Sequence, residues 1–368
     1  MTARSAHLAR RPDPVRTAED PPIRLLIVDD SSVARAVLSR MVGSQPGLEV
    51  AATACCLADA LKVLRSITVD VVLLDIEMPG GSGLEGLPEI IEAGRGARVL
   101  IVSSSADEGA EAAMRALALG AADTMTKPVS GLFGGRFAEA LAERVRRIGR
   151  VGAIDRSLPQ SEGGKPRLRE VADWQPACIA IGASTGGIHA INEFVARLPR
   201  RTGVPILLTQ HLPPLFMPYF ARQVAVSSGR RTRVVASDEL VTADEIHVAP
   251  GNAHLRLVRR GGKVRIMLDT APAPSGCLPS VDPMLASVAE IYGRGGVAVM
   301  LSGMGRDGLI GSSTLVSSGG IVLAQDQASS AIWGMPRAVA DAGLATAVAH
   351  PGDLARRIAG QLGSDAWK

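Results

Sequence analysis

The sequence predicts the α/β fold class, with two doubly wound domains that are each built on a mostly parallel sheet. Two observations lead to this prediction. Short apolar runs alternate with amphipathic segments through both halves of the chain, as they do in strand–helix–strand units. Between the halves, residues 143–175 are rich in Gly, Pro, Ser and charged residues, which is typical of a linker.

The length of the chain also favours two domains, because 368 residues exceed what one ordinary domain contains. The first residues are polar and arginine-rich, and they end in a Pro-Pro pair. We therefore expect a disordered leader at residues 1–22, a first domain at 23–142, a linker at 143–175 and a second domain at 176–368.

The composition argues against several classes of protein. Aromatic residues make up only 3% of the chain, too few for the stacking platforms of single-stranded nucleic-acid binders. The net charge of +4 is mostly spread among acidic residues, so we expect no nucleic-acid partner. No apolar run reaches the length of a membrane span, and the N-terminus lacks the apolar core of a signal peptide. These features predict a cytoplasmic protein without membrane insertion.

The cysteines agree with that location. Cys55, Cys56, Cys178 and Cys277 show no C-x-x-C spacing. They therefore predict neither a disulfide framework nor a zinc site, and they fit a reducing compartment.

Polar side chains gather where the predicted strands of the first half end. The strands are expected at 23–28, 48–52, 70–75, 98–102 and 122–126. Ligands of parallel sheets bind at the carboxyl ends of the strands. The residues expected together at this edge are Asp29, Asp30, Asp75, Ser103 and Lys127.

The chemistry of these five side chains suggests phosphoryl transfer. One acidic residue at a strand end is usually a helix cap, but five polar or charged residues at four strand ends are not explained in that way. Crowded carboxylates repel one another unless a hard cation lies between them, and oxygen ligands suit Mg²⁺. A hydroxyl and an ammonium opposite them would contact the oxygens of a phosphoryl group on Asp75.

Residues 23 to about 140 resemble a response-regulator receiver domain, which has a flavodoxin-like fold. The resemblance lies in Val28-Asp29-Asp30-Ser31, Leu74-Asp75-Ile76-Glu77-Met78-Pro79 and Thr126-Lys127-Pro128. It implies that Asp75 accepts a phosphoryl group from a histidine kinase. It also implies that Asp29, Asp30 and Asp75 hold Mg²⁺, while Ser103 and Lys127 sense the phosphorylation state. The loop Gly80-Gly81-Ser82-Gly83 departs from the family pattern, which usually has a Met-Asp-Gly turn there.

Three arginines close the last helix of this half: Arg144, Arg146 and Arg147. A solvated helix end is the ordinary interpretation of such a run, and a docking face is the alternative.

The second half opens with a strand, a glycine turn and a helix over Cys178 to His189. Ser184 lies in the turn, where glycines permit a tight path and the helix start offers unpaired N–H groups. Gly182-Ala-Ser-Thr-Gly186 fits the G-x-S-x-G nucleophile turn. A phosphate-cradling turn or a plain strand-to-helix connection is the alternative, although a P-loop is disfavoured because no Lys-Ser/Thr pair follows.

Further strands and helices continue the alternation. Strands are expected at 204–210, 245–250, 254–258, 264–268, 296–301 and 320–324, with helices at 283–291 and 335–342. The strands at 245–250, 254–258 and 264–268 are expected to pair with one another.

A serine nucleophile needs a base and a group that orients the base. His211 ends a parallel-type strand at the same edge as Ser184, whereas His189 lies on the helix surface. Asp307 follows a third strand through a glycine-rich loop, and Asp282 and Asp326 are competing candidates for orienting the base. The order Ser, His, Asp along the chain differs from that of α/β-hydrolases.

Residues from about 177 to 360 are similar to the catalytic domain of the chemotaxis methylesterase family CheB. The similarity lies in Gly182-Ala-Ser-Thr-Gly-Gly187, Gln210-His-Leu-Pro-Pro214, His247-Val-Ala-Pro-Gly251, Pro279-Ser-Val-Asp282, Leu301-Ser-Gly-Met-Gly-Arg-Asp-Gly308 and Gly334-Met-Pro336.

This similarity implies that Ser184 attacks the γ-methyl ester of a glutamate on a chemoreceptor, and that no cofactor takes part. His211 would then act as acid and base, Asp307 would orient it, and backbone N–H groups near Thr185 and Met304 would bind the oxyanion. Deamidation of receptor glutamines is implied as well. The family also implies that the receiver covers the esterase cleft until Asp75 is phosphorylated.

Three other functions stay open on the sequence. A non-enzymatic docking protein is disfavoured because Ser184, His211 and Asp307 are all present. A DNA-binding regulator is disfavoured because no terminal helix-turn-helix pattern is found. A hydrolase that acts on a different ester is not distinguished by sequence.

Overall fold

The computed structural model describes residues 21–78, 83–103, 108–127, 135–149, 167–171 and 173–362. Nearly all of the expected leader, the loop residues Gly80 to Ser82 and residues 150–166 of the expected linker lie outside these ranges.

The N-terminal half folds around a parallel sheet with the strand order β2-β1-β3-β4-β5. Its strands are β1 (Ile23–Val28), β2 (Leu48–Ala54), β3 (Val71–Leu74), β4 (Arg98–Ser103) and β5 (Asp123–Thr126). Its helices are α1 (Ser32–Gly43), α2 (Leu57–Ser66), α3 (Leu87–Ala93), α4 (Glu108–Ala118) and α5 (Gly135–Gly149). All four residues of β3 are buried, as expected for a central strand that helices cover on both faces.

The C-terminal half holds a larger parallel sheet with the order β14-β13-β12-β6-β7-β9-β8. Its strands are β6 (Cys178–Ala183), β7 (Ile206–Gln210), β8 (Thr232–Val234), β9 (Ile246–Val248), β12 (Gly296–Met300), β13 (Ile321–Gln325) and β14 (Ala347–Ala349). Two doubly wound, parallel sheets therefore confirm the predicted α/β class.

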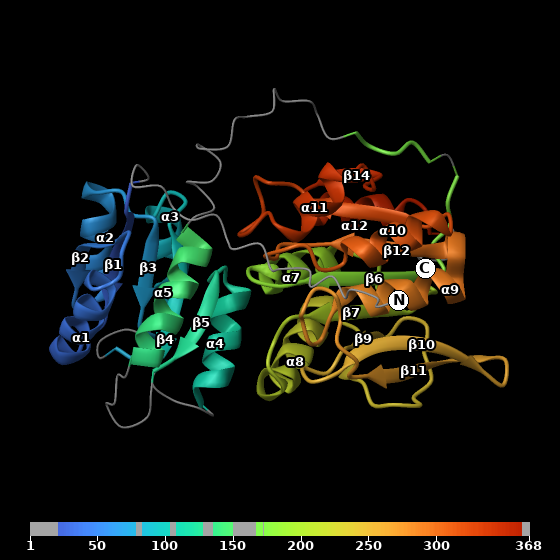
Figure 1. The fold of residues 1–368 in the computed structure, drawn as a ribbon, viewed down its shortest axis with the longest axis horizontal. Coiled ribbons are helices and arrows are strands. Elements are labelled where there is room, and N and C mark those ends of the chain that lie inside the picture. The colour runs from blue at the N-terminus through green and yellow to red at the C-terminus, as the bar shows by residue number, and fades with distance from the viewer. Residues whose placement is uncertain are drawn as a thin grey trace, which may run out of the picture.

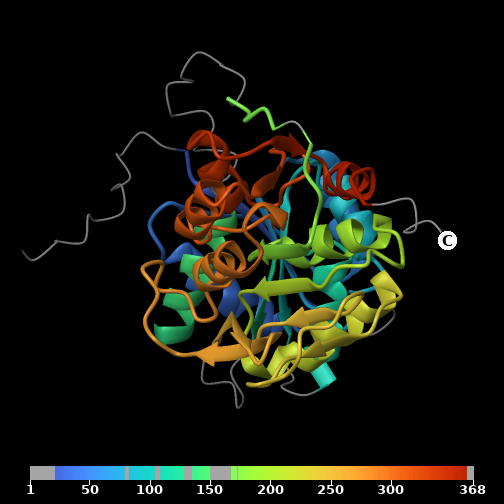
Figure 2. The same cartoon turned by 90° about the vertical axis from the view of Figure 1, so that its right-hand side faces the viewer.

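Helices cover both faces of the larger sheet (Figure 2). One face packs against α7 (Gly187–Arg197), α8 (Met217–Ser228) and α12 (Pro351–Ala359). The other packs against α9 (Val281–Tyr292), α10 (Leu309–Ser317) and α11 (Met335–Asp341). Two short 3-10 turns, η1 (Pro214–Phe216) and η2 (Gly293–Gly295), complete the order.

The predicted pairing of the 245–250 strand was wrong. β9 joins the main sheet between β7 and β8, in parallel. Only β10 (His254–Arg260) and β11 (Lys263–Asp269) form an antiparallel hairpin, as a separate two-stranded sheet. All three residues of β9 are buried, so this strand suits the interior of the main sheet better than a solvent-facing hairpin.

The three central strands β12, β6 and β7 bring distant segments to one edge. Gly182 pairs with Met300 on one side and with Thr209 on the other. The chain beyond each strand therefore starts at the same level: Ser184 after β6, His211 after β7, and the loop to Asp307 after β12.

The two halves pack against each other, with α4 beside α7 and α8 (Figure 1). The backbone N–H of Gly186 donates to the carbonyl of Ala122, 3.2 Å away. The His189 ring nitrogen Nδ1 lies 2.9 Å from the carbonyl oxygen of Ala118. Within the described ranges, no helix is both long and apolar enough to cross a membrane.

Gly182 is predicted to tolerate no side chain. A Cβ there would lie 2.6 Å from Cγ1 of Val281, the first residue of α9. We expect Gly182→Ala to lower the free energy of unfolding by about 1–3 kcal/mol, because overpacking a rigid core strains it. Urea denaturation measures the change. Gly43→Ala is the matched control, since nothing lies within 4 Å of its added Cβ; equal stability loss in both variants would contradict the account.

Candidate active site

The backbone of Ser184 is held at three points. Its N–H donates to the carbonyl of Ser302 (3.0 Å), and its own carbonyl accepts from the N–H of Gly187 (2.8 Å) and from Nε2 of Gln210 (2.8 Å). The turn then requires the left-handed conformation at Gly186, which has φ 73°. A Cβ at Gly186 would also lie 2.2 Å from that of Ala331. The glycine turn therefore fixes the backbone of Ser184 at the end of β6.

His211 and Asp307 form a direct contact. Nε2 of His211 lies 2.8 Å from Oδ2 of Asp307, whose side chain is almost fully buried. Asp307 Oδ1 accepts from the Ser280 hydroxyl (2.6 Å), and Oδ2 accepts from the Val281 N–H (2.8 Å). Because Val281 begins α9, the carboxylate also lies at a helix N-terminus, where negative charge is favoured.

The pKa values of this pair move in opposite directions. Burial raises the pKa of Asp307, but the hydrogen bonds from His211, Ser280 and Val281 outweigh it and lower the pKa to about 2. For His211, burial lowers the pKa, but the contacts with Asp307 and Cys277 outweigh it and raise the pKa to about 9. Both shifts favour a charged imidazolium–carboxylate pair.

The two competing carboxylates make other contacts. Asp282 accepts from the N–H of Gly311 (2.7 Å), and burial together with the nearby Asp307 raises its pKa to about 6. Asp326 accepts from the N–H and the hydroxyl of Ser329. Of the three candidates, Asp307 is the one that bonds His211.

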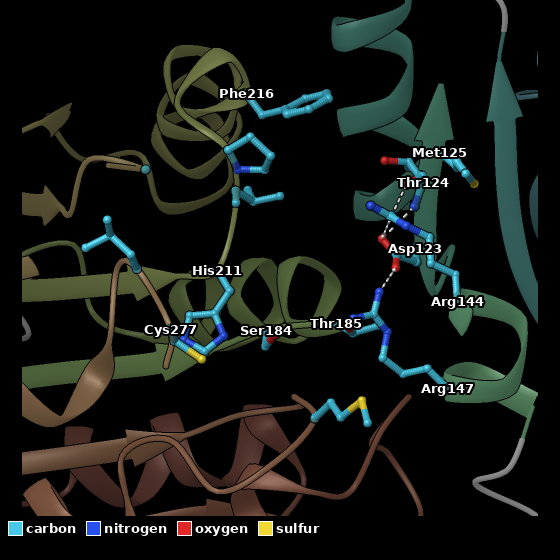
Figure 3. A pocket seen from close by; sticks show the side chains of 15 residues that line it. Asp123, Thr124, Met125, Arg144, Arg147, Ser184, Thr185, His211, Phe216 and Cys277 are labelled. Carbon is cyan, nitrogen blue, oxygen red and sulfur yellow. Dashed lines mark hydrogen bonds and ion pairs between the residues drawn. The ribbon is translucent and has the colours of Figure 1, made fainter. Parts of the chain in front are cut away.

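A cavity of about 770 Å³ contains both Ser184 and His211 (Figure 3). Among the described residues the Ser184 hydroxyl makes no hydrogen bond to His211, although both side chains line this cavity. Thr185 and Met304 also line this cavity. Within the described part of the chain their backbone N–H groups donate no hydrogen bond, which leaves two donors free beside Ser184.

The opposite wall of the cavity comes from the N-terminal half. It is formed by Asp123, Thr124 and Met125 of β5 and by Arg144 and Arg147 of α5 (Figure 3). Both arginines pair with Asp123, at 3.1 Å each. The interpretation of these arginines as a solvated helix end was therefore wrong, because they are half-buried at a wall between the two halves.

The other described histidines have structural contacts. His247 is fully buried beside the backbone of Thr242. His350 caps α12 and lies 3.4 Å from Glu193. His254 Nδ1 accepts from the N–H of Ser280 at 2.8 Å, so it supports the serine that holds Asp307.

Sequence reasoning did not assign a role to Ser280 or His254. The Pro-Ser-Val-Asp motif at residues 279–282 was the available signal for Ser280. His254 offered none, because its contact joins a hairpin strand to a loop far along the chain.

The predicted acidic cluster of the first half is present. Oxygens of Asp29, Asp30 and Asp75 all lie within 4.8 Å of one another. Nζ of Lys127 lies 2.6 Å from Asp29 Oδ2 and 2.7 Å from Asp75 Oδ2. Burial raises the pKa of Asp75, and Lys127 partly offsets this. Ser103 ends β4 next to Thr126, and its side chain lies outside what the structure describes.

This donor set fits Mg²⁺. Three carboxylates offer oxygen atoms only, which suits a hard cation, and one ammonium does not balance their charge. Asp29, Asp30 and Asp75 are the residues that would hold the ion.

Known proteins match the chain in both halves. The family model of the CheB methylesterase matches residues 179–358, and that of the response regulator receiver domain matches residues 25–131. A protein-glutamate methylesterase/protein-glutamine glutaminase from Nitrobacter hamburgensis is 36% identical, over 89% of this chain and 91% of that protein.

A second such protein, from Caulobacter vibrioides, is 40% identical over 89% of this chain and 95% of its own length. The crystal structure of the Thermotoga maritima CheB methylesterase catalytic domain is 32% identical and covers 52% of this chain and 99% of that one, with a TM-score of 0.49. On the similarity to these curated relatives, this chain belongs to the CheB methylesterase family and carries a response-regulator receiver domain ahead of its catalytic domain.

Proposed function

We propose that this protein is a phosphorylation-activated protein-glutamate methylesterase that also deamidates glutamine, and that it works as a serine hydrolase. Ser184, His211 and Asp307 are the proposed catalytic residues. The observation that carries the proposal is a buried His211–Asp307 pair beside a rigidly held serine in one cavity. The relatives named above carry the same two activities in their names.

The geometry suggests which nitrogen of His211 does the chemistry. Nε2 faces Asp307, so Nδ1 remains for the serine proton. Ser184 Oγ attacks the ester carbonyl while Nδ1 takes its proton, and the oxyanion forms beside the N–H groups of Thr185 and Met304. The proton then passes from His211 to the leaving methoxide, which departs as methanol. Water, activated by the same nitrogen, hydrolyses the acyl-enzyme.

Asp307 has two roles in this proposed cycle. It fixes the imidazole with Nε2–H towards the carboxylate, and it stabilises the imidazolium that forms when His211 takes the proton. An amide in place of the ester would release ammonia by the same steps. No cofactor is required for either reaction.

The receiver is proposed to control access to this site. Its β5 and α5 form one wall of the cavity, opposite Ser184. Lys127 directly follows β5 and bridges Asp29 and Asp75. A phosphoryl group on Asp75, bound with Mg²⁺ at Asp29 and Asp30 and sensed by Ser103 and Lys127, would draw this lysine into new contacts and displace β5 from the cleft.

The proposal implies particular partners and a location. A histidine kinase would supply the phosphoryl group, and methyl-accepting chemoreceptors would be the substrates. A cytoplasmic location fits four cysteines that are all free.

A non-enzymatic docking role is less well supported than hydrolysis. A degenerate site would have no reason to keep a buried charge held by three hydrogen bonds, because such a charge is costly to bury. Hydrolysis of a different ester remains the second candidate, and a scan of ester substrates would distinguish it.

Replacing the proposed nucleophile tests the esterase directly. We expect Ser184→Ala to reduce methanol release from methyl-labelled receptor membranes by at least about 10³-fold, since the proposed acyl-enzyme forms on the Ser184 hydroxyl. Ser313→Ala, an exposed serine on α10, is the matched control and should keep full activity. Equal release by wild type and Ser184→Ala would rule out this nucleophile.

The raised pKa of His211 predicts the dependence of activity on pH. Only neutral His211 accepts a proton, so kcat/KM should rise with pH until the imidazolium is lost, with its midpoint shifted upwards from about 6.5 towards about 9. Asp307→Asn removes the stabilising charge, so its midpoint should move to lower pH while kcat falls by about 10⁴-fold. Asp326→Asn should leave the profile unchanged. An unshifted midpoint in Asp307→Asn would show that another group titrates.

Phosphorylation should act through Asp75 alone. We expect a small-molecule phosphodonor with Mg²⁺ to increase methanol release by wild type and not by Asp75→Asn, because only Asp75 would carry the phosphoryl group. Asp70→Asn is the matched control: this exposed carboxylate lies just before the opposite end of β3 and should keep full activation. Activation that persists in Asp75→Asn would contradict the proposed switch.

A further inference from the structure

The thiol of Cys277 lies beside the proposed base, and no bond-forming or proton-transfer step of the proposed ester hydrolysis uses it. Cys277 lines the same cavity as Ser184 and His211. Figure 3 shows its sulfur next to the imidazole ring of His211. A ring nitrogen of His211, the Cys277 sulfur and a carboxylate oxygen of Asp307 all lie within 4.8 Å of one another. Three different donor types thus converge on one point.

Imidazole, thiolate and carboxylate are the three side-chain ligands that zinc binds in proteins. Zinc bonds of about 2.0–2.3 Å in a tetrahedral arrangement place neighbouring ligand atoms roughly 3.2–3.8 Å apart. The His211–Asp307 contact of 2.8 Å lies just below this range, and the 4.8 Å limit on the set lies above it. Shifts of about 1 Å would therefore bring all three atoms around one ion.

The surroundings hold the two ligands differently. The Cys277 sulfur lies 3.9 Å from the carbonyl oxygen of Ser275, a weak contact that a bond to a metal ion would replace. Asp307 is held by Ser280 and Val281, as metal-ligating carboxylates are usually held by further hydrogen bonds. His211 and Cys277 line the cavity, so a water molecule there would be within reach of an ion as a fourth ligand.

We propose that His211, Cys277 and Asp307 form a zinc site that switches the esterase off. Zinc on Nδ1 of His211 would occupy the atom that takes the serine proton, and zinc on Nε2 would replace the bond to Asp307. The base is lost in either case. Binding requires the thiolate and the neutral imidazole, so it releases protons and becomes tighter as pH rises.

Two other clusters in the described ranges can compete for metal. Cys55, Cys56 and Asp59 lie together on the receiver surface, and the Asp29–Asp30–Asp75 cluster offers oxygen atoms only. Oxygen ligands suit Mg²⁺ rather than zinc. The receiver cysteines are therefore the control that any test requires.

The first arm of the test is inhibition of the full-length protein by zinc chloride. We expect zinc to inhibit methanol release by wild type, and a chelator to restore it. In Cys277→Ser the inhibition constant for zinc, measured against the zinc-free activity of that variant, should rise at least about tenfold. The double variant Cys55→Ser/Cys56→Ser should be inhibited like wild type. Equal inhibition of wild type and Cys277→Ser would overturn the proposal.

The second arm measures binding without catalysis. Co²⁺ in place of zinc should give one thiolate-to-metal absorption band that is lost in Cys277→Ser and kept in the double variant. A band that survives in Cys277→Ser and disappears in the double variant would place the metal on the receiver and refute the site. The inhibition arm rests on the proposed esterase function. If wild type released no methanol even without zinc, that function would fail while the cobalt band still decided the metal site.

Discussion

The buried carboxylate of Asp307 is the constraint on which most of the catalytic half depends. An ionised carboxylate is costly to remove from water unless hydrogen bonds and an opposite charge compensate it. Here His211, Ser280 and the start of α9 provide that compensation. Gly182 must lack a side chain for α9 to come this close to β6, and His254 holds Ser280 from behind. Residues that are not among those lining the cavity thus determine where His211, the proposed base, lies.

In the receiver, buried carboxylates are compensated by a lysine instead of a histidine. Two carboxylates that lie close together, Asp29 and Asp75, share the ammonium of Lys127. The proposed phosphoryl group on Asp75 would compete with these carboxylates for the ammonium of Lys127. Lys127 directly follows β5, and β5 forms part of the wall of the cavity that contains Ser184. In the proposed switch, this strand transmits a change of charge at Asp75 to the catalytic half.

Sequence patterns predicted the strands that are long and apolar, and through them the α/β class. They failed for short elements: β8 and β14 have three residues each, too few to show a period, and β9 was paired with the wrong neighbour. In the site, strand ends pointed to Ser184, His211 and Asp307 because parallel strands align their carboxyl ends. The contacts of Cys277, Ser280 and Arg147 were not predictable, since each depends on how loops or whole halves of the chain pack.

Covalent trapping tests the central claim, that Ser184 is activated by the His211–Asp307 pair, most directly. A fluorophosphonate probe would be added to the full-length protein, and the labelled peptide would be identified by mass spectrometry. The account predicts one adduct, on Ser184, that forms much more slowly in Asp307→Asn and faster after treatment with a phosphodonor. An adduct on another residue, or labelling of Ser184 at the same rate in Asp307→Asn, would contradict it.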